Sequence, residues 1–244
     1  MISHCVVRSM NRLITFLFLG LAISLAPKTA LADSDPIIKS WKLPQENQRK
    51  KLTVEYLKRH TPKHQLRGDP KEDVYMKPRV IVLHWTGGPS LKTAWNTFSS
   101  ATLRGRKKLK KASALNVGAH FLVDRDGSIF RLVEEQRIMR HCIGLNHVAI
   151  GVENVGGGKR WPLTKAQQKA NARLVRYLAS KYPITHLIGH YEYRNMESHP
   201  YFSEADPKYQ TIKIDPGTEF MRAVRRQVAD LELLSGGSGI TPTD

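Results

Sequence analysis

Cysteine, acidic side chains and long apolar runs are all scarce in this chain of 244 residues. Of its two cysteines, only Cys142 lies beyond the first 32 residues, so the rest of the chain cannot form an internal disulfide. The first 32 residues hold an uncharged apolar stretch, residues 13–26, which is shorter than the roughly 20 residues that a membrane-spanning helix needs. These absences exclude a disulfide-stapled fold and argue against a transmembrane anchor.

The start of the chain has the pattern of a signal peptide. Arg8 and Arg12 precede the apolar stretch, and the two alanines of Ala30-Leu31-Ala32 have the spacing of a cleavage site. We predict that residues 1–32 are removed by cleavage after Ala32, and that the protein is then periplasmic or secreted with no transmembrane anchor. An uncleaved anchor is the alternative, although its apolar stretch would be short.

The surplus of basic residues predicts an anionic partner. The chain has 39 Lys and Arg against 21 Asp and Glu, a formal charge of +18, and loss of Arg8, Arg12 and Lys28 with the leader leaves +15. The densest patch is residues 104–111. An exported protein with this charge would meet anionic polymers of the cell envelope, so nucleic acid is not expected as a partner. The alternative for 104–111 is a solvated loop that binds nothing.

The apolar patterning alternates between helix and strand. Periodicity predicts helices at residues 41–60, 90–101, 163–182 and 220–234. Apolar and β-branched runs predict strands at 79–84, 119–123, 128–133, 149–154 and 186–190, with Asp126-Gly127 in a tight turn between the second and the third. A basic loop is expected at 104–115. Interleaved strands and helices predict an α/β fold with a single mixed central β-sheet flanked by helices.

The predicted organisation has four parts. The signal peptide, residues 1–32, is followed by an N-terminal helical segment and linker, residues 33–78, which we expect to pack on the main domain as an appendage. Residues 79–234 would form the main domain, which is small enough to have a single core. Residues 235–244 are rich in Gly, Ser, Thr and Pro and predict a disordered tail.

Three side chains have the types and positions of metal ligands. His84 ends one predicted strand, His190 ends another, and Asp215 stands before Pro216-Gly217 at the start of the last helix. Two imidazoles and one carboxylate at the edge of a sheet are typical of a catalytic zinc site that keeps its fourth position for water. For each histidine taken alone, a structural hydrogen-bonding role is the alternative.

Six short segments carry a more specific signal: VIVLHWTG at 80–87, GAHFLVDRDG at 118–127, HCIGLN at 141–146, IGVENVG at 150–156, IGH at 188–190 and KIDPG at 213–217. With these segments in this order, the chain resembles the zinc amidases that act on N-acetylmuramoyl-L-alanine, which are related in fold to the peptidoglycan-recognition proteins. The resemblance covers residues 79–228. It implies that fold, one Zn²⁺ per chain, and peptidoglycan or muropeptide as the substrate.

By position in these motifs, His84, His190 and Asp215 would hold the zinc ion. Glu153 corresponds to the acidic catalytic residue of the family, which would accept a proton from water and pass it to the leaving amine. Lys213 corresponds to the cationic residue, which would stabilise the oxyanion. The alternatives are an ordinary strand-edge carboxylate for Glu153 and a solvated cation for Lys213.

The motifs also suggest residues around the reaction centre. The resemblance places His141 and Asn146 in the wall of the pocket that meets the sugar or the first peptide residues. Trp85, next to a predicted ligand, either offers an apolar face to the sugar or packs in the core. His120 lies within an apolar strand, which favours a buried histidine that is hydrogen-bonded to a neighbour.

One segment departs from the family pattern. Residues 191–212 form a long insertion between the second histidine and the aspartate, and the insertion could act as a lid or a wall of the substrate groove. It also contains His199, a rival for His190 as a ligand. We favour His190, because the strand before it determines its position, whereas His199 lies in a Pro-flanked stretch.

The sequence therefore predicts an exported zinc-dependent amidase that hydrolyses the amide bond between N-acetylmuramic acid and L-alanine. A non-catalytic module that recognises peptidoglycan on the same fold is the main alternative, but all three ligand positions are filled here. A nucleic-acid-binding protein is a second alternative, and it is disfavoured because residues 104–111 contain no aromatic side chain for base stacking.

Overall fold

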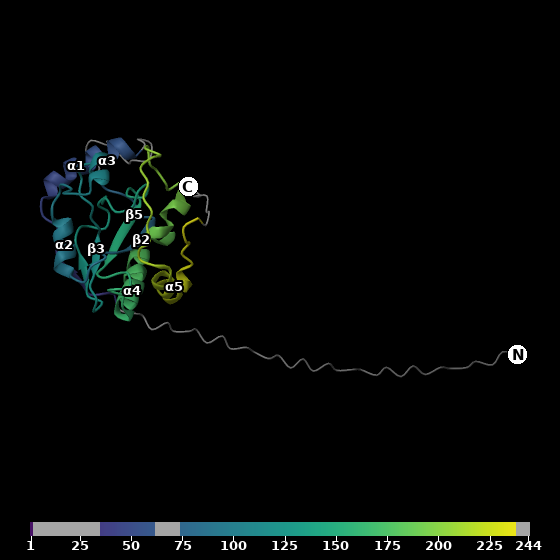
Figure 1. Ribbon diagram of the computed structural model, residues 1–244. Helices are drawn as coiled ribbons and strands as arrows, with labels where there is room; N and C mark the ends of the chain where they lie inside the picture. Colours follow the sequence, from purple (N-terminus) through teal and green to yellow (C-terminus); the bar gives the residue numbers. More distant parts are fainter. Residues whose placement is uncertain (2–34, 62–73, 238–244) are drawn as a thin grey trace. The chain divides into compact units, whose positions relative to one another are not determined.

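The computed structural model describes residue 1 and residues 35–61 and 74–237 (Figure 1). The predicted signal peptide, most of the predicted linker and the end of the predicted tail lie outside the described residues. Within the described part of the chain, no helix combines the length and the apolar character that crossing a bilayer requires.

A six-stranded sheet with the order β1-β4-β3-β5-β2-β6 forms the centre of the fold. The β3–β4 pair is antiparallel, while β1–β4, β3–β5, β5–β2 and β2–β6 are parallel. The sheet is therefore mixed, as predicted. The strands are β1 Ile38–Ser40, β2 Val80–Trp85, β3 Phe121–Val123, β4 Ile129–Arg131, β5 Ala149–Asn154 and β6 His186–Gly189.

Helices cover both faces of the sheet. The α-helices are α1 Glu46–His60, α2 Leu91–Ser99, α3 Lys107–Ala112, α4 Lys165–Lys181 and α5 Thr218–Gln227, and the 3₁₀ helices are η2 His190–Met196 and η3 Ala229–Leu231. Helix α4 begins after Thr164, whose hydroxyl accepts a hydrogen bond from the backbone of Gln167 while the Gln167 side chain accepts one from the backbone of Thr164. This capping box satisfies backbone donors that would otherwise lack partners.

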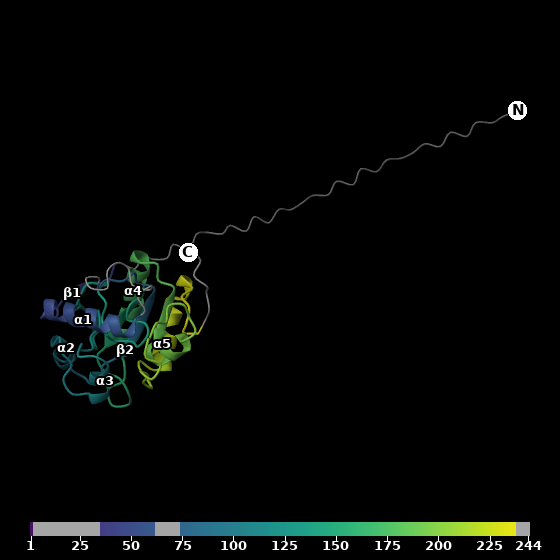
Figure 2. The same ribbon diagram turned by 90° about the horizontal axis from the view of Figure 1, so that it is seen from above.

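Alternation along the strands assigns the two faces. Phe121 and Val123 of β3 belong to the large core that includes α4 and α5, which pack side by side (Figure 1). Leu122, between them, packs instead with Ala94 and Phe98 of α2. Because successive side chains of a strand point to opposite faces, α2 covers the face opposite to α4 (Figure 2).

The N-terminal segment is more integrated with the sheet than the sequence suggested. The helix predicted at 41–60 begins only at Glu46, and the preceding residues extend the sheet: β1 pairs with β4, and the backbone amide of Trp41 donates to the carbonyl of Arg131. Pro44 lacks a backbone donor, and Gln45 has a left-handed φ of 61°, so the helix does not extend further back. The sequence contains no long-range signal for this pairing.

Two further elements differ from the predictions. The predicted basic loop contains helix α3, whose last carbonyls are reached from a distant segment: the Arg140 guanidinium donates to the carbonyl oxygens of Leu109 and Ser113. The predicted final helix, 220–234, ends earlier, at Gln227. Leu234 leaves the helical path because its backbone exchanges hydrogen bonds with Thr185 and Leu187 beside β6.

Candidate active site

Parallel strands bring three functional side chains to one edge of the sheet. His84 of β2 lies directly opposite Glu153 of β5, and Leu83 lies opposite Gly189 of β6. His190 follows Gly189 and so comes beside His84. Opposed residues on neighbouring strands point to the same face, so the His84 and Glu153 side chains emerge together. The β-branched and apolar runs that form these strands thus determine where this chemistry lies.

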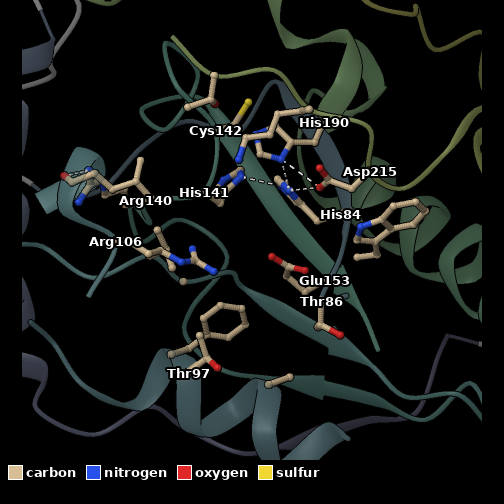
Figure 3. A pocket seen from close by; sticks show the side chains of 18 of the residues that line it. His84, Thr86, Thr97, Arg106, Arg140, His141, Cys142, Glu153, His190 and Asp215 are labelled. Carbon is tan, nitrogen blue, oxygen red and sulfur yellow. Dashed lines mark hydrogen bonds and ion pairs between the residues drawn. The ribbon is translucent and has the colours of Figure 1, made fainter. Parts of the chain in front are cut away.

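His84, His190 and Asp215 meet at this edge and are called the His-His-Asp cluster below. Their Nδ1, Nδ1 and Oδ2 atoms form a triangle with sides of 2.9 Å between the histidines, 3.2 Å from His84 to Asp215 and 3.0 Å from His190 to Asp215 (Figure 3). The backbone amide of Tyr191 donates to the Asp215 carbonyl at 3.0 Å. That bond ties the loop before α5 to η2, and so brings Asp215 to the histidines.

A partly buried ion pair supports the backbone that carries His190. The Glu192 carboxylate accepts hydrogen bonds from the Gly189 amide at 2.7 Å and from the Arg225 guanidinium at 2.5 Å. Arg225 also donates to the carbonyl of Leu187, at 2.8 Å. One arginine of α5 therefore holds both the end of β6 and the first turn of η2, with His190 between them.

The electrostatics of the His-His-Asp cluster suit a cation. Burial lowers the pKa of His190 from 6.5 to about 3, and the proximity of His84 adds to this effect. For Asp215, burial alone would raise the pKa, but the adjacent His190 and His84 side chains outweigh it and bring the pKa well below its usual range. At neutral pH the cluster therefore offers an unprotonated His190 imidazole and a carboxylate, the forms that bind metal.

The donor set fits a zinc ion. Two imidazole nitrogens and one carboxylate oxygen are three protein ligands of the kind found in catalytic zinc sites. When each ligand atom lies about 2.0–2.1 Å from the same zinc ion, any two ligand atoms lie less than about 4.2 Å from each other. The three ligand atoms of the cluster satisfy this condition. Among the described residues this is the group of His, Cys, Asp and Glu side chains that could hold a metal ion. The rival His199 lies elsewhere, with its ring against those of His186 and Tyr201.

Glu153 is a partly buried acid next to the cluster (Figure 3). Burial raises its pKa well above the ordinary value, the charge of Asp215 adds to the increase, and Lys213 and Arg106 oppose it. Its Oε2 atom is buried and makes no hydrogen bond to the described residues. Such an oxygen is free to bond to water or to a substrate, and proton transfer requires that freedom.

The cluster and Glu153 line a cavity of about 260 Å³. Its wall also includes Lys213, Phe98 of α2 and, from the inserted segment 191–212, Tyr209. Arg106 lines it as well, next to α3. The sequence reasoning did not identify Phe98, Arg106 or Tyr209 as site residues. The only signals were the basic run that contains Arg106 and the unusual length of the insertion.

The three suggested substrate contacts have different environments. Trp85 lines the cavity, and its ring packs so closely on Gly157 that a Cβ added there would lie 2.3 Å from it. The ring nitrogens of His141 lie 3.1 Å from His84 Nε2 and 3.0 Å from the carbonyl oxygen of Ala149. Both nitrogens are therefore engaged within the protein.

Asn146 and His120 are likewise bonded inside the fold. Asn146 is 4% exposed, and its Oδ1 accepts the backbone amides of His141 and Cys142, each at 2.8 Å. His120 donates from Nε2 to the carbonyl of Arg137 and accepts at Nδ1 from the Gly151 amide. The prediction of a buried, hydrogen-bonded His120 is confirmed.

Residues 74–218, more than half of the chain, match the protein family described as N-acetylmuramoyl-L-alanine amidase. The chain belongs to this family. The matched range contains the His-His-Asp cluster together with Glu153 and Lys213, whereas α1 precedes it and most of α5 follows it.

Individual amidases and endolysins are also similar to the chain. The endolysin of Escherichia phage T7 is 36% identical over 88 residues, which are 34% of this chain and 58% of that protein. The chain thus spans less than two thirds of this curated relative. The structure of the N-acetylmuramoyl-L-alanine amidase LysC from Clostridium intestinale URNW is 23% identical, with a TM-score of 0.46 over 64% of this chain and 89% of that one.

Proposed function

We propose that the protein is a zinc-dependent amidase that hydrolyses the bond between N-acetylmuramic acid and L-alanine in peptidoglycan or its fragments. The observation that carries this proposal is the His-His-Asp cluster with a partly buried acid, Glu153, beside it in one cavity. Membership of the N-acetylmuramoyl-L-alanine amidase family supports the choice of this bond. His84, His190 and Asp215 would hold one Zn²⁺ per chain.

In this proposal, Glu153 and Lys213 have separate roles in the hydrolysis. A bound zinc ion would supply a Lewis acid that polarises the scissile carbonyl and activates a water molecule. Glu153 accepts a proton as water adds to the carbonyl carbon, and passes it to the L-alanine nitrogen as the C–N bond breaks. Lys213 stabilises the negative charge that develops on the carbonyl oxygen. The products are a free lactyl carboxylate and a peptide with a free amino terminus.

The cellular setting is part of the same proposal. A protein that is secreted or periplasmic after cleavage behind Ala32 would meet peptidoglycan directly. The basic surface would favour attachment to anionic envelope polymers, since Arg104, Lys107, Lys110 and Lys111 are all exposed near or on α3. Arg106 would extend this positive potential into the cavity, toward the carboxylates of the wall peptides.

The test is hydrolysis of purified peptidoglycan by the purified chain. Mass spectrometry should find released peptides that begin with a free L-alanine, a chelator should abolish their release, and added Zn²⁺ should restore it. Release that persists in the metal-free protein would contradict the proposal. Binding to peptidoglycan without release, in a zinc-loaded protein, would instead indicate a recognition module.

A variant separates the proton-transfer role of Glu153 from metal binding. Glu153→Gln should lower the turnover number at least about 100-fold, because proton transfer by a positioned side chain contributes about 10²- to 10⁴-fold. Its zinc content should equal that of the unaltered chain. Glu219→Gln, at a side chain that is 82% exposed on α5, is the matched control and should retain full activity. Turnover above a tenth of the original in Glu153→Gln would refute the assigned role.

A further inference from the structure

We propose that His141 is a positioning residue that determines which ring nitrogen of His84 faces the metal. The inference rests on the proposed zinc function, and it differs from the substrate-contact role that the sequence suggested. It follows from a chain of hydrogen bonds that runs from the carbonyl of Ala149 through two imidazoles to the His-His-Asp cluster. Figure 3 shows the part of this chain from His141 to the cluster.

The carbonyl of Ala149 sets the direction of this chain. A carbonyl oxygen only accepts, so the Nε2 of His141 must donate to it, at 3.0 Å. A neutral imidazole carries one N–H, so the Nδ1 of His141 is then an acceptor. The Nε2 of His84 lies 3.1 Å from it and must be the donor. The lone pair of His84 is consequently on Nδ1.

This arrangement leaves the correct atom of His84 available. Nδ1 is the atom that faces His190, at 2.9 Å, and Asp215, at 3.2 Å. A ring with the opposite tautomer would aim an N–H at the place of the ion and could not ligate it. The two imidazoles are nearly perpendicular, at 88°, so the bond from His141 also restrains the rotation of the His84 ring. Such outer partners usually set the orientation and basicity of ligand histidines.

His141 is itself held in place by contacts unrelated to the substrate. Its backbone amide donates to the Asn146 side chain at 2.8 Å, and the Asn146 amide group donates to the hydroxyl of Tyr56 on α1 at 2.9 Å. The His141 ring also lies against Gly151 of β5, where an added Cβ would come within 2.7 Å of it. The N-terminal helix α1 thus supports the metal ligand through Tyr56, Asn146 and His141.

The experiment measures zinc affinity by competition with a chromogenic chelator. His141→Phe retains a ring but removes the acceptor, and should weaken zinc binding by about 10- to 100-fold, the usual effect of losing such a partner. His141→Asn places an amide oxygen near the position of Nδ1, so it can still accept from His84 and should bind zinc within about fivefold of the unaltered chain. Tyr56→Phe should weaken binding by a few fold.

The outcomes separate three roles of His141. A substrate contact would raise KM in His141→Phe and leave zinc affinity unchanged, which would overturn the inference. A purely structural role would lower the melting temperature of the metal-free variants, with equal zinc affinity in His141→Phe and His141→Asn, and would overturn it as well. If the unaltered chain binds no zinc, the proposed function itself fails. If the unaltered chain and His141→Phe bind zinc with equal affinity, only the inference about His141 fails.

Discussion

Acidification should destabilise the protein through His120, a histidine of the core. The ring is 0% exposed, and burial lowers its pKa from 6.5 to about 4, although its hydrogen bond to the Arg137 carbonyl opposes this change. Its remaining nitrogen accepts the Gly151 amide at 2.9 Å, so protonation of that nitrogen would break this bond. In the unfolded chain the same histidine takes up a proton near its ordinary pKa of 6.5.

The sign and size of the effect follow from the two pKa values. A histidine with a lowered pKa in the folded state contributes stability that is present above pH 6.5 and is lost as the pH falls towards 4. Each pKa unit corresponds to about 1.4 kcal/mol, so the total loss is about 3 kcal/mol. About 2 kcal/mol of it falls between pH 7 and pH 5.

The assay compares urea unfolding of the unaltered chain and of His120→Asn at pH 7 and pH 5, with a chelator present to exclude metal binding. Asparagine can accept the Gly151 amide but does not titrate, so the variant should lose about 2 kcal/mol less than the unaltered chain over this interval. Other buried histidines, such as His147, titrate in both proteins and cancel in the difference. Equal losses in the two proteins would refute the account of His120.

Two further predictions concern the framework of the site. Arg225→Met should lower the free energy of unfolding by about 2 kcal/mol, because the buried Glu192 loses its cation. The control Arg222→Met removes an exposed ion pair, and its free energy of unfolding should stay within about 0.5 kcal/mol of that of the unaltered chain. Similar urea midpoints for the two variants would contradict this prediction. Gly144→Ala should cost more than about 1 kcal/mol, because Gly144 has a φ of 75° and a Cβ would lie 2.3 Å from the Phe202 ring. An unchanged melting temperature would disprove that strain.

The elements with strong local signals were predicted closely. Strand β5 has the predicted bounds, and α4, Lys165–Lys181, lies within two residues of the predicted 163–182 at each end. In both cases the deciding interactions lie within a few residues: a run of mostly buried residues in the strand, and a capping box within one helical turn. The parallel pairing of β2 with β5 then places His84 opposite Glu153.

Sequence alone determined the fold class and the side chains that meet at the edge of the sheet, because residue type and periodicity record whether a segment is buried and where a strand ends. Tertiary structure alone decided that β1 joins the sheet, that 107–112 is helical, and that His141 and Asn146 bond within the protein. These outcomes depend on hydrogen bonds between segments far apart in the chain, such as that from Asn146 to Tyr56. No local pattern encodes such bonds, since each partner is chosen only when the fold brings the segments together.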